Sequence, residues 1–136
     1  MRSTPRARAT LAAVVAVTLA AVAATAARAA SVLDFDVWMR AIDKHSVDVQ
    51  KNIAAGRTDA AIADAQELAR LYGLMEAYFV EDGHAPDAVT LSQSGKALAA
   101  AIPSALAAKD ADGAARSALE LAHACNDCHD NHKPFQ

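Results

Sequence analysis

Two cysteines and three histidines gather in one short segment near the C-terminus, HACNDCHDNHK at residues 123–133. Within it, Cys125, Cys128 and His129 form C-x-x-C-H, the spacing through which c-type haem is attached. On a helix, positions i, i+3 and i+4 share a face, so two thiols can bond the two vinyl groups of a haem while the imidazole reaches its iron. The motif therefore predicts one covalently bound haem c, attached through Cys125 and Cys128 and ligated by His129.

Two other chemistries use the same residue types. A thioredoxin-like redox pair places C-x-x-C at a helix N-terminus beside a sheet, whereas this pair comes late in a helical pattern and no strand pattern competes with it. A zinc site from Cys125, Cys128, His129 and His132 has suitable ligands, but four side chains on one helix face do not easily surround a metal tetrahedrally. Both remain as alternatives to haem.

The first 29 residues have the pattern of a secretory leader. Three arginines lie within the first eight residues, an uncharged apolar run covers 11–25, and Ala-Arg-Ala at 27–29 supplies small residues for cleavage. A retained membrane anchor is the alternative, but the run is short for a span and poor in Leu, Ile and Phe. We expect cleavage after Ala29 and a mature domain, 30–136, in the periplasm and without a membrane association.

The charge of the mature chain restricts its partners. Removing the leader takes away four arginines and no acid, so nine basic residues face sixteen acidic ones and the net charge is −7. A nucleic acid or an anionic membrane would favour the opposite sign. The acidic surface favours a protein partner with a basic docking patch.

Four helical segments follow the leader, because apolar residues recur at three- and four-residue steps and alanine is abundant. The predicted segments run from Leu33 to a stop at Gly56, from Thr58 to about Phe79, from Leu91 to Lys109, and from about Asp112 into the cysteine motif, with a loop over 80–90. Pro103 is expected to kink or shorten the third. Short connections between amphipathic helices predict an all-α, antiparallel four-helix bundle, and its alanine-rich faces leave room for a cofactor.

The inward face of each helix follows from the same periodicity. The first helix should turn Met39 inward between Phe35 and Ile42, and the second should bury Met75. Trp38 and Tyr72 are expected to pack between helices. In the last helix the predicted inward residues are Ala115, Ala118, Leu119 and Ala122, followed by Cys125 and His129.

A second iron ligand has to precede the motif. Only seven residues follow His129, none of them methionine, and His123 and His132 lie on the same helix as His129. A core methionine most often serves packing, and this reading stays open for Met39. His45, near the edge of the first helix's apolar face, is a reserve ligand.

The C-x-x-C-H in the last helix of an exported four-helix domain resembles the class II cytochromes c, the cytochrome c prime family. The resemblance covers nearly all of the mature chain, with specific matches at 125–129 and looser ones in the first helix. In that family a first-helix residue lies over the open haem face, about four and a half turns before the glycine that ends the helix. Counting back from Gly56 implies that this residue is Met39, as in the low-spin electron carriers. The resemblance also allows a homodimer through the first two helices.

The chain departs from the family at the residues that pair with the haem propionates. Phe35 stands where many members carry an arginine, and His132 and Lys133 replace the usual aromatic-arginine pair. Lys133 is the best remaining candidate for a propionate.

These features predict a periplasmic monohaem electron-transfer protein, not an enzyme, whose haem iron is ligated by His129 and Met39. The alternative is a five-coordinate protein in which Met39 only shields the distal side and nitric oxide or carbon monoxide binds. A peroxidase-like enzyme is less well supported, because no distal acid-base residue is evident in the sequence.

Overall fold

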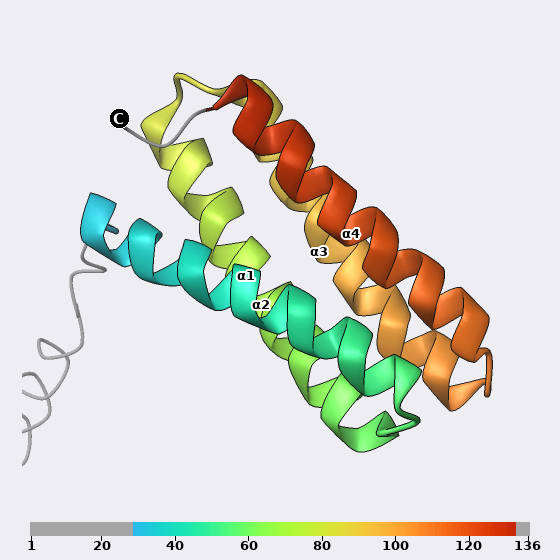
Figure 1. The fold of residues 1–136 in the computed structure, drawn as a ribbon. Helices are drawn as coiled ribbons and strands as arrows, with labels where there is room; N and C mark the ends of the chain where they lie inside the picture. Colours follow the sequence, from blue (N-terminus) through green and yellow to red (C-terminus); the bar gives the residue numbers. More distant parts are fainter. Residues whose placement is uncertain (1–28, 133–136) are drawn as a thin grey trace, which may run out of the picture.

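Four helices make up the part of the chain that the computed structural model describes, residues 29–132. They are α1 (Val32–Ala54), α2 (Thr58–Asp82), α3 (Pro86–Ala107) and α4 (Ala111–Asn131), and no strand occurs among these residues. Each helix packs on the next along the chain, and α1 also packs on α4 (Figure 1). The predicted all-helical, four-helix architecture is confirmed.

Two predictions fall outside the described range. The leader lies there except for Ala29, and so does Lys133. Within the described range, no helix combines the length and the apolar character that a membrane crossing requires.

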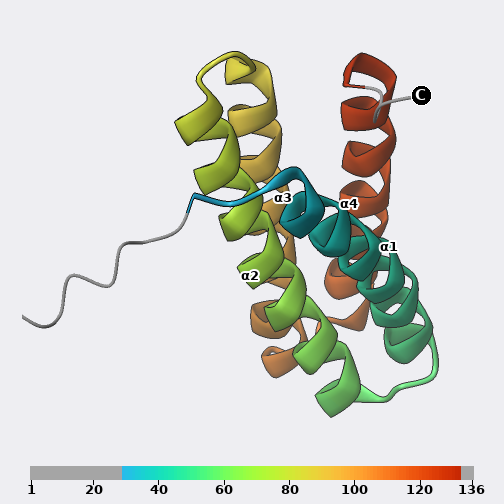
Figure 2. The ribbon, with the colours of Figure 1, turned by 90° about the vertical axis from the view of Figure 1, so that its left-hand side faces the viewer.

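Contacts between helix ends show that neighbouring helices run antiparallel. Phe35, at the start of α1, packs on Tyr78 and Phe79 near the end of α2, with ring centroids 5.0 and 5.5 Å apart. His132, just after α4, bonds Asp87 at the start of α3 and lies 6.5 Å from the Phe79 ring. One end of the bundle therefore gathers the start of α1, the end of α2, the start of α3 and the end of α4. In Figure 2 the first turns of α1 appear between α2 and α4.

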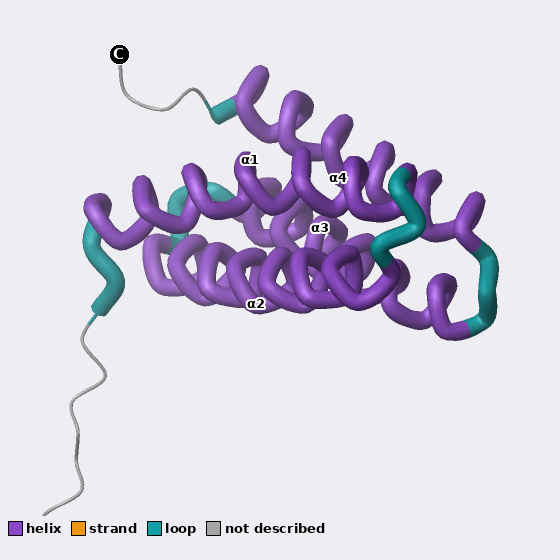
Figure 3. The backbone as a smooth tube through the Cα atoms, turned by 60° about the horizontal axis from the view of Figure 1, so that its bottom comes forward, coloured by secondary structure: helices purple, strands orange, loops and turns teal. Residues whose placement is uncertain are grey.

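Local sequence signals set the helix boundaries. Ser31 and Asp34 form a capping box at the start of α1. Gly83 ends α2 in the left-handed conformation, with φ 72°, and Pro86 occupies the first turn of α3. The predicted loop over 80–90 was therefore too long, because a glycine cap and an N-terminal proline reduce it to three residues, 83–85. Figure 3 draws the loops that connect the helices in teal. Pro103 lies inside α3, and the helix continues past it to Ala107.

Alanine makes up much of the core. Ala61, Ala65, Ala99, Ala114 and Ala118 are at most 1% exposed and pack with larger buried residues, among them Leu68, Leu71, Ile102 and Leu121. Such small side chains let the helix backbones approach one another closely. The predicted inward faces of α1 and α2 are confirmed, since Ile42 and Met75 are buried and Phe35 and Met39 pack against the core.

The predicted inward face of α4 was partly wrong. Leu121 is fully buried, whereas Leu119 is 53% exposed and Ala115 is also exposed. The buried positions are Ala114, Ala118 and Leu121, and Cys125 continues the same face. The predicted and the observed face share Ala118, and each carries one leucine, so residue spacing alone does not decide which leucine meets the neighbouring helices.

This register gives a direct test. Leu121→Ala should lower the free energy of unfolding by about 2–5 kcal/mol, because it leaves a cavity in the core. Leu119→Ala, two residues away on the same helix, should change it by about 0.5 kcal/mol or less. Urea unfolding followed by circular dichroism measures both, and a loss in Leu119→Ala equal to that in Leu121→Ala would contradict the observed register.

Candidate functional site

A cavity near the shared end of the bundle brings together residues from all four helices. Its lining consists of Met39 and Ile42 from α1, Tyr72 and Met75 from α2, Leu91 and Ser92 from α3, and Ala124, Cys125, Cys128 and His129 from α4. Most of these side chains are apolar, and the polar or sulfur-bearing ones come mainly from α2 and α4. The antiparallel arrangement explains the meeting, because each contributing segment lies near the same end of the bundle.

The structure places all four predicted site residues at this cavity. Cys125 and Cys128 are half-buried free thiols on one face of α4, and His129 beside them is exposed to solvent. Met39 is half-buried and packs against the core, as its position between Phe35 and Ile42 predicted. Met39 and His129 are far apart in the sequence, and the packing of the helices brings them to one site.

Tyr72 makes a polar contact with the motif that the sequence did not predict. Its ring is buried, and its hydroxyl lies 3.2 Å from the Sγ of Cys125, at hydrogen-bond distance. Burial raises the pKa of the Tyr72 phenol, and the neighbouring Cys125 thiol raises it further. The phenol therefore remains protonated at neutral pH.

Gly95 on α3 explains how the Tyr72 ring fits. A Cβ atom at Gly95 would overlap the Tyr72 ring, so this position needs a residue without a side chain. Gly95 is buried inside α3, where glycine is a poor helix former. A glycine at an unfavourable helical position is the sequence signal that indicates such a close approach.

Met75 is a second methionine at the site. It is 3% exposed, as expected for a core residue, and it also lines the cavity with Met39. Two thioether sulfurs therefore lie near the cysteine motif, and the sequence had assigned only one of them to the site.

His132 and Asp87 link the last turn of α4 to α3. The His132 Nε2 lies 2.6 Å from the Asp87 Oδ2, and this hydrogen bond holds the pKa of the Asp87 carboxyl below its usual value. Burial raises the pKa of the Cys128 thiol, with smaller contributions from Cys125 and Asp87. His132 thus stabilises the turn that carries Cys128 and His129.

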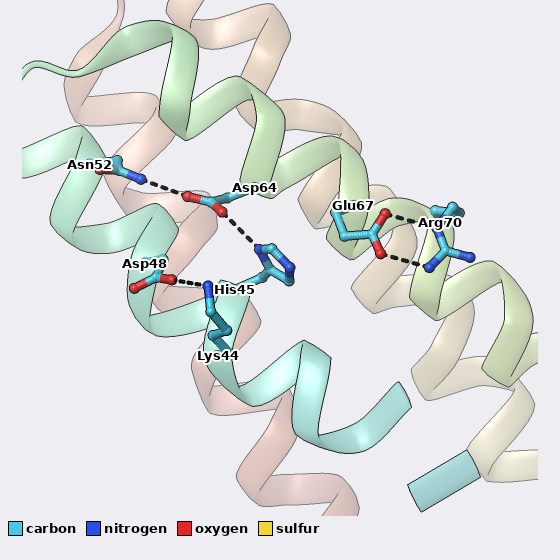
Figure 4. Close-up of polar contacts among 7 residues, drawn as sticks. All are labelled: Lys44, His45, Asp48, Asn52, Asp64, Glu67 and Arg70. Carbon is cyan, nitrogen blue, oxygen red and sulfur yellow. Dashed lines mark hydrogen bonds and ion pairs between the residues drawn. The ribbon is translucent and has the colours of Figure 1, made fainter. Parts of the chain in front are cut away.

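His45, the reserve ligand, points elsewhere. Its Nδ1 lies 2.8 Å from the Oδ1 of Asp64 on α2, and Asn52 donates to the other oxygen of the same carboxylate at 2.6 Å (Figure 4). His45 is not among the cavity-lining residues. Its contact with Asp64 joins α1 to α2.

The residues that line the cavity include the side-chain types that hold a covalent haem in other proteins. Two thiols, an imidazole and methionine sulfurs surround an apolar space, which is the donor set that haem c uses. Within residues 29–132 no three His, Cys, Asp or Glu side chains meet as a metal-binding group. The cysteines lie in the last turns of α4, at the wrong end of a helix for a thioredoxin-like pair.

The cavity is smaller than a haem requires. Its volume is about 20 Å³, whereas pockets that hold small molecules usually measure about 300–1,000 Å³. Accommodating a haem would require the surrounding side chains to rearrange or the helices to separate.

Comparisons with protein-family models, with curated proteins and with solved structures found no match to this chain. The functional interpretation therefore depends on the motif and on the residues that surround it.

The link between His132 and Asp87 predicts a pH dependence. Because the folded pKa of Asp87 is lowered, its contact stabilises the protein above the ordinary carboxyl pKa of about 3.9 and is lost as pH falls through the lowered value. At pH 5, Asp87→Asn should lower the melting temperature more than Asp59→Asn, which removes a carboxylate from the first turn of α2. The difference should disappear in strong acid, and equal melting temperatures at pH 5 would contradict the role of the contact.

Proposed function

We propose that this protein is an exported monohaem c-type cytochrome that transfers electrons, with its haem iron ligated by His129 and Met39. The observation that carries the proposal is that Cys125, Cys128 and His129 share one cavity with a methionine from a different helix. A C-x-x-C-H motif lying on an exposed surface, far from any sulfur ligand, would not support it.

Each part of the site has a role under this proposal. Cys125 and Cys128 would hold the haem as thioethers, with each S–H added across a vinyl double bond so that no oxidant or reductant is consumed. His129 would hold the iron from α4, and the apolar side chains around the cavity would exclude water. A bound haem supplies the one-electron chemistry, and methionine ligation raises its reduction potential relative to two imidazoles.

The surface near His129 fits a redox partner with a basic docking patch. His129 is exposed, so the cofactor would lie close to the surface. Asp127 and Asp130 flank it on α4, and both are exposed. Together with the mature charge of −7 they would steer the protein towards a basic surface and speed the encounter at low ionic strength. Such a partner would be met in the periplasm, where the leader predicts that the protein resides.

Spectra of two methionine variants test the iron ligand. If Met39 ligates iron, the wild-type protein should be low-spin, and Met39→Leu should be high-spin and should bind carbon monoxide in the ferrous state. Met75→Leu, which changes the other methionine at the cavity, should remain low-spin. A low-spin to high-spin change in Met75→Leu alone would reassign the ligand. A high-spin wild-type spectrum that neither substitution changes would favour the five-coordinate, gas-binding alternative.

Covalent attachment has its own test. Replacing both cysteines, with Cys125→Ser and Cys128→Ser, should abolish haem that survives a denaturing gel, because no thiol remains to form a thioether. Ser104→Cys, at an exposed position of α3, restores a thiol outside the motif when it is placed in the double variant, and it should not restore the haem. A haem-stained band from the double variant would show that attachment does not use this motif.

A further inference from the structure

We infer that Tyr72 is a positioning residue for the cofactor, and that its phenol donates a hydrogen bond to the Cys125 sulfur while Gly95 leaves the space that its ring requires. This inference rests on the proposed haem attachment. It extends the site beyond the C-x-x-C-H motif to one residue on α2 and one on α3.

The contact crosses the bundle. Helices α2 and α4 are not neighbours in the bundle, since each packs on α3 and α1. The Tyr72 side chain nevertheless reaches the Cys125 Sγ at 3.2 Å, and within residues 29–132 the phenol has no other hydrogen-bond partner. Tyr72 therefore ties the attachment residue on α4 to the opposite helix.

The direction of the hydrogen bond follows from the chemistry of attachment. A free thiol can either donate or accept, but a thioether has no hydrogen and can only accept. The buried phenol keeps its proton, so it can remain the donor after the thioether has formed. Cys128 has no described phenol at its sulfur, so the two attachment points are not equivalent.

The close approach of Gly95 to the Tyr72 ring also supports the inferred role of Tyr72. Its missing side chain lies against the Tyr72 ring, so a methyl group there would push the ring away from its position. By contrast, a Cβ at Gly73 would meet only the end of the Lys96 side chain, at 3.9 Å from its Cε, which is an ordinary contact distance. The two helical glycines thus form a matched pair, one next to Tyr72 and one away from it.

A hydrogen bond to the attached sulfur draws electron density away from the haem and should favour the reduced state. Hydrogen bonds near a haem are one of the means by which a protein adjusts its potential. Tyr72→Phe keeps the ring and removes the donor. We expect it to lower the ratio of reduced to oxidised protein at a fixed potential about threefold, a fall of about 28 mV in midpoint potential at 59 mV per tenfold.

The experiment measures the midpoint potential of the full, haem-loaded protein by spectroelectrochemical titration. Tyr78→Phe is the control, because Tyr78 lies on the same helix and packs in the aromatic cluster with Phe35 and Phe79. Its potential should equal that of the wild type. Thermal melting of each variant records stability separately, since a role in packing alone would lower the melting temperature without changing the potential.

Gly95→Ala provides a second route to the same result. It retains the phenol but displaces it from the sulfur, so its potential should fall in the same direction as that of Tyr72→Phe, while Gly73→Ala should match the wild type. If Tyr72→Phe does not load haem, the glycine pair still decides the question.

The outcomes separate this inference from the proposed function. Wild-type protein without covalent haem would overturn the proposed function and this inference together. Loaded wild-type protein whose potential is shared by Tyr72→Phe and Tyr78→Phe, or by Gly95→Ala and Gly73→Ala, would overturn this inference alone.

Discussion

Antiparallel packing is the constraint on which the candidate site depends. The cysteine motif occupies the last turns of α4, and the residues that meet it across the cavity come from the other three helices. Only because the start of α1 lies at the same end of the bundle does Met39 reach the cavity that contains His129. The contact of Phe35 with Phe79 and that of His132 with Asp87 hold the four helix ends together there.

Small residues determine how closely the helices approach. The buried alanines allow a tight bundle, and the cavity that remains at the motif is about 20 Å³. A large buried side chain fits into this packing where the facing residue has no side chain. Tyr72 and Gly95 are such a pair, and the same pair brings a phenol to the sulfur of Cys125. Packing and site chemistry are therefore coupled at this end of the molecule.

Two histidines form polar contacts between helices, one between α1 and α2 and one between α4 and α3. The Asp64 carboxylate on α2 bonds both His45 and Asn52 of α1, away from the cavity. One nitrogen of the His45 imidazole is therefore occupied by a carboxylate. At the cavity end, His132 likewise forms a hydrogen bond with Asp87. Both histidines could serve as ligands by residue type, and in each case a nearby carboxylate occupies a ring nitrogen instead. His129 differs from them in facing the cavity beside the two thiols.

The sequence by itself determined the helical class and the inward faces of α1 and α2, and it put Cys125, Cys128 and His129 on one helix. These features follow from local periodicity and from spacing within one helix, both of which can be read directly from the sequence. The loop predicted between α2 and α3 was too long. Gly83 ends α2 and Pro86 begins α3, and the polar character of the segment alone does not show these boundaries. Leu119 was also misplaced, because residue spacing alone did not decide whether Leu119 or Leu121 is the core leucine of α4.

Only the tertiary structure decided which distant residues meet. It brought Met75 as well as Met39 to the cavity, placed the Tyr72 hydroxyl on Cys125, and turned His45 towards Asp64. The physical reason is that each of these contacts joins different helices, so it depends on their relative rotation and depth. Those quantities are set by the packing of all four helices at once and have no signature in any single segment of the sequence.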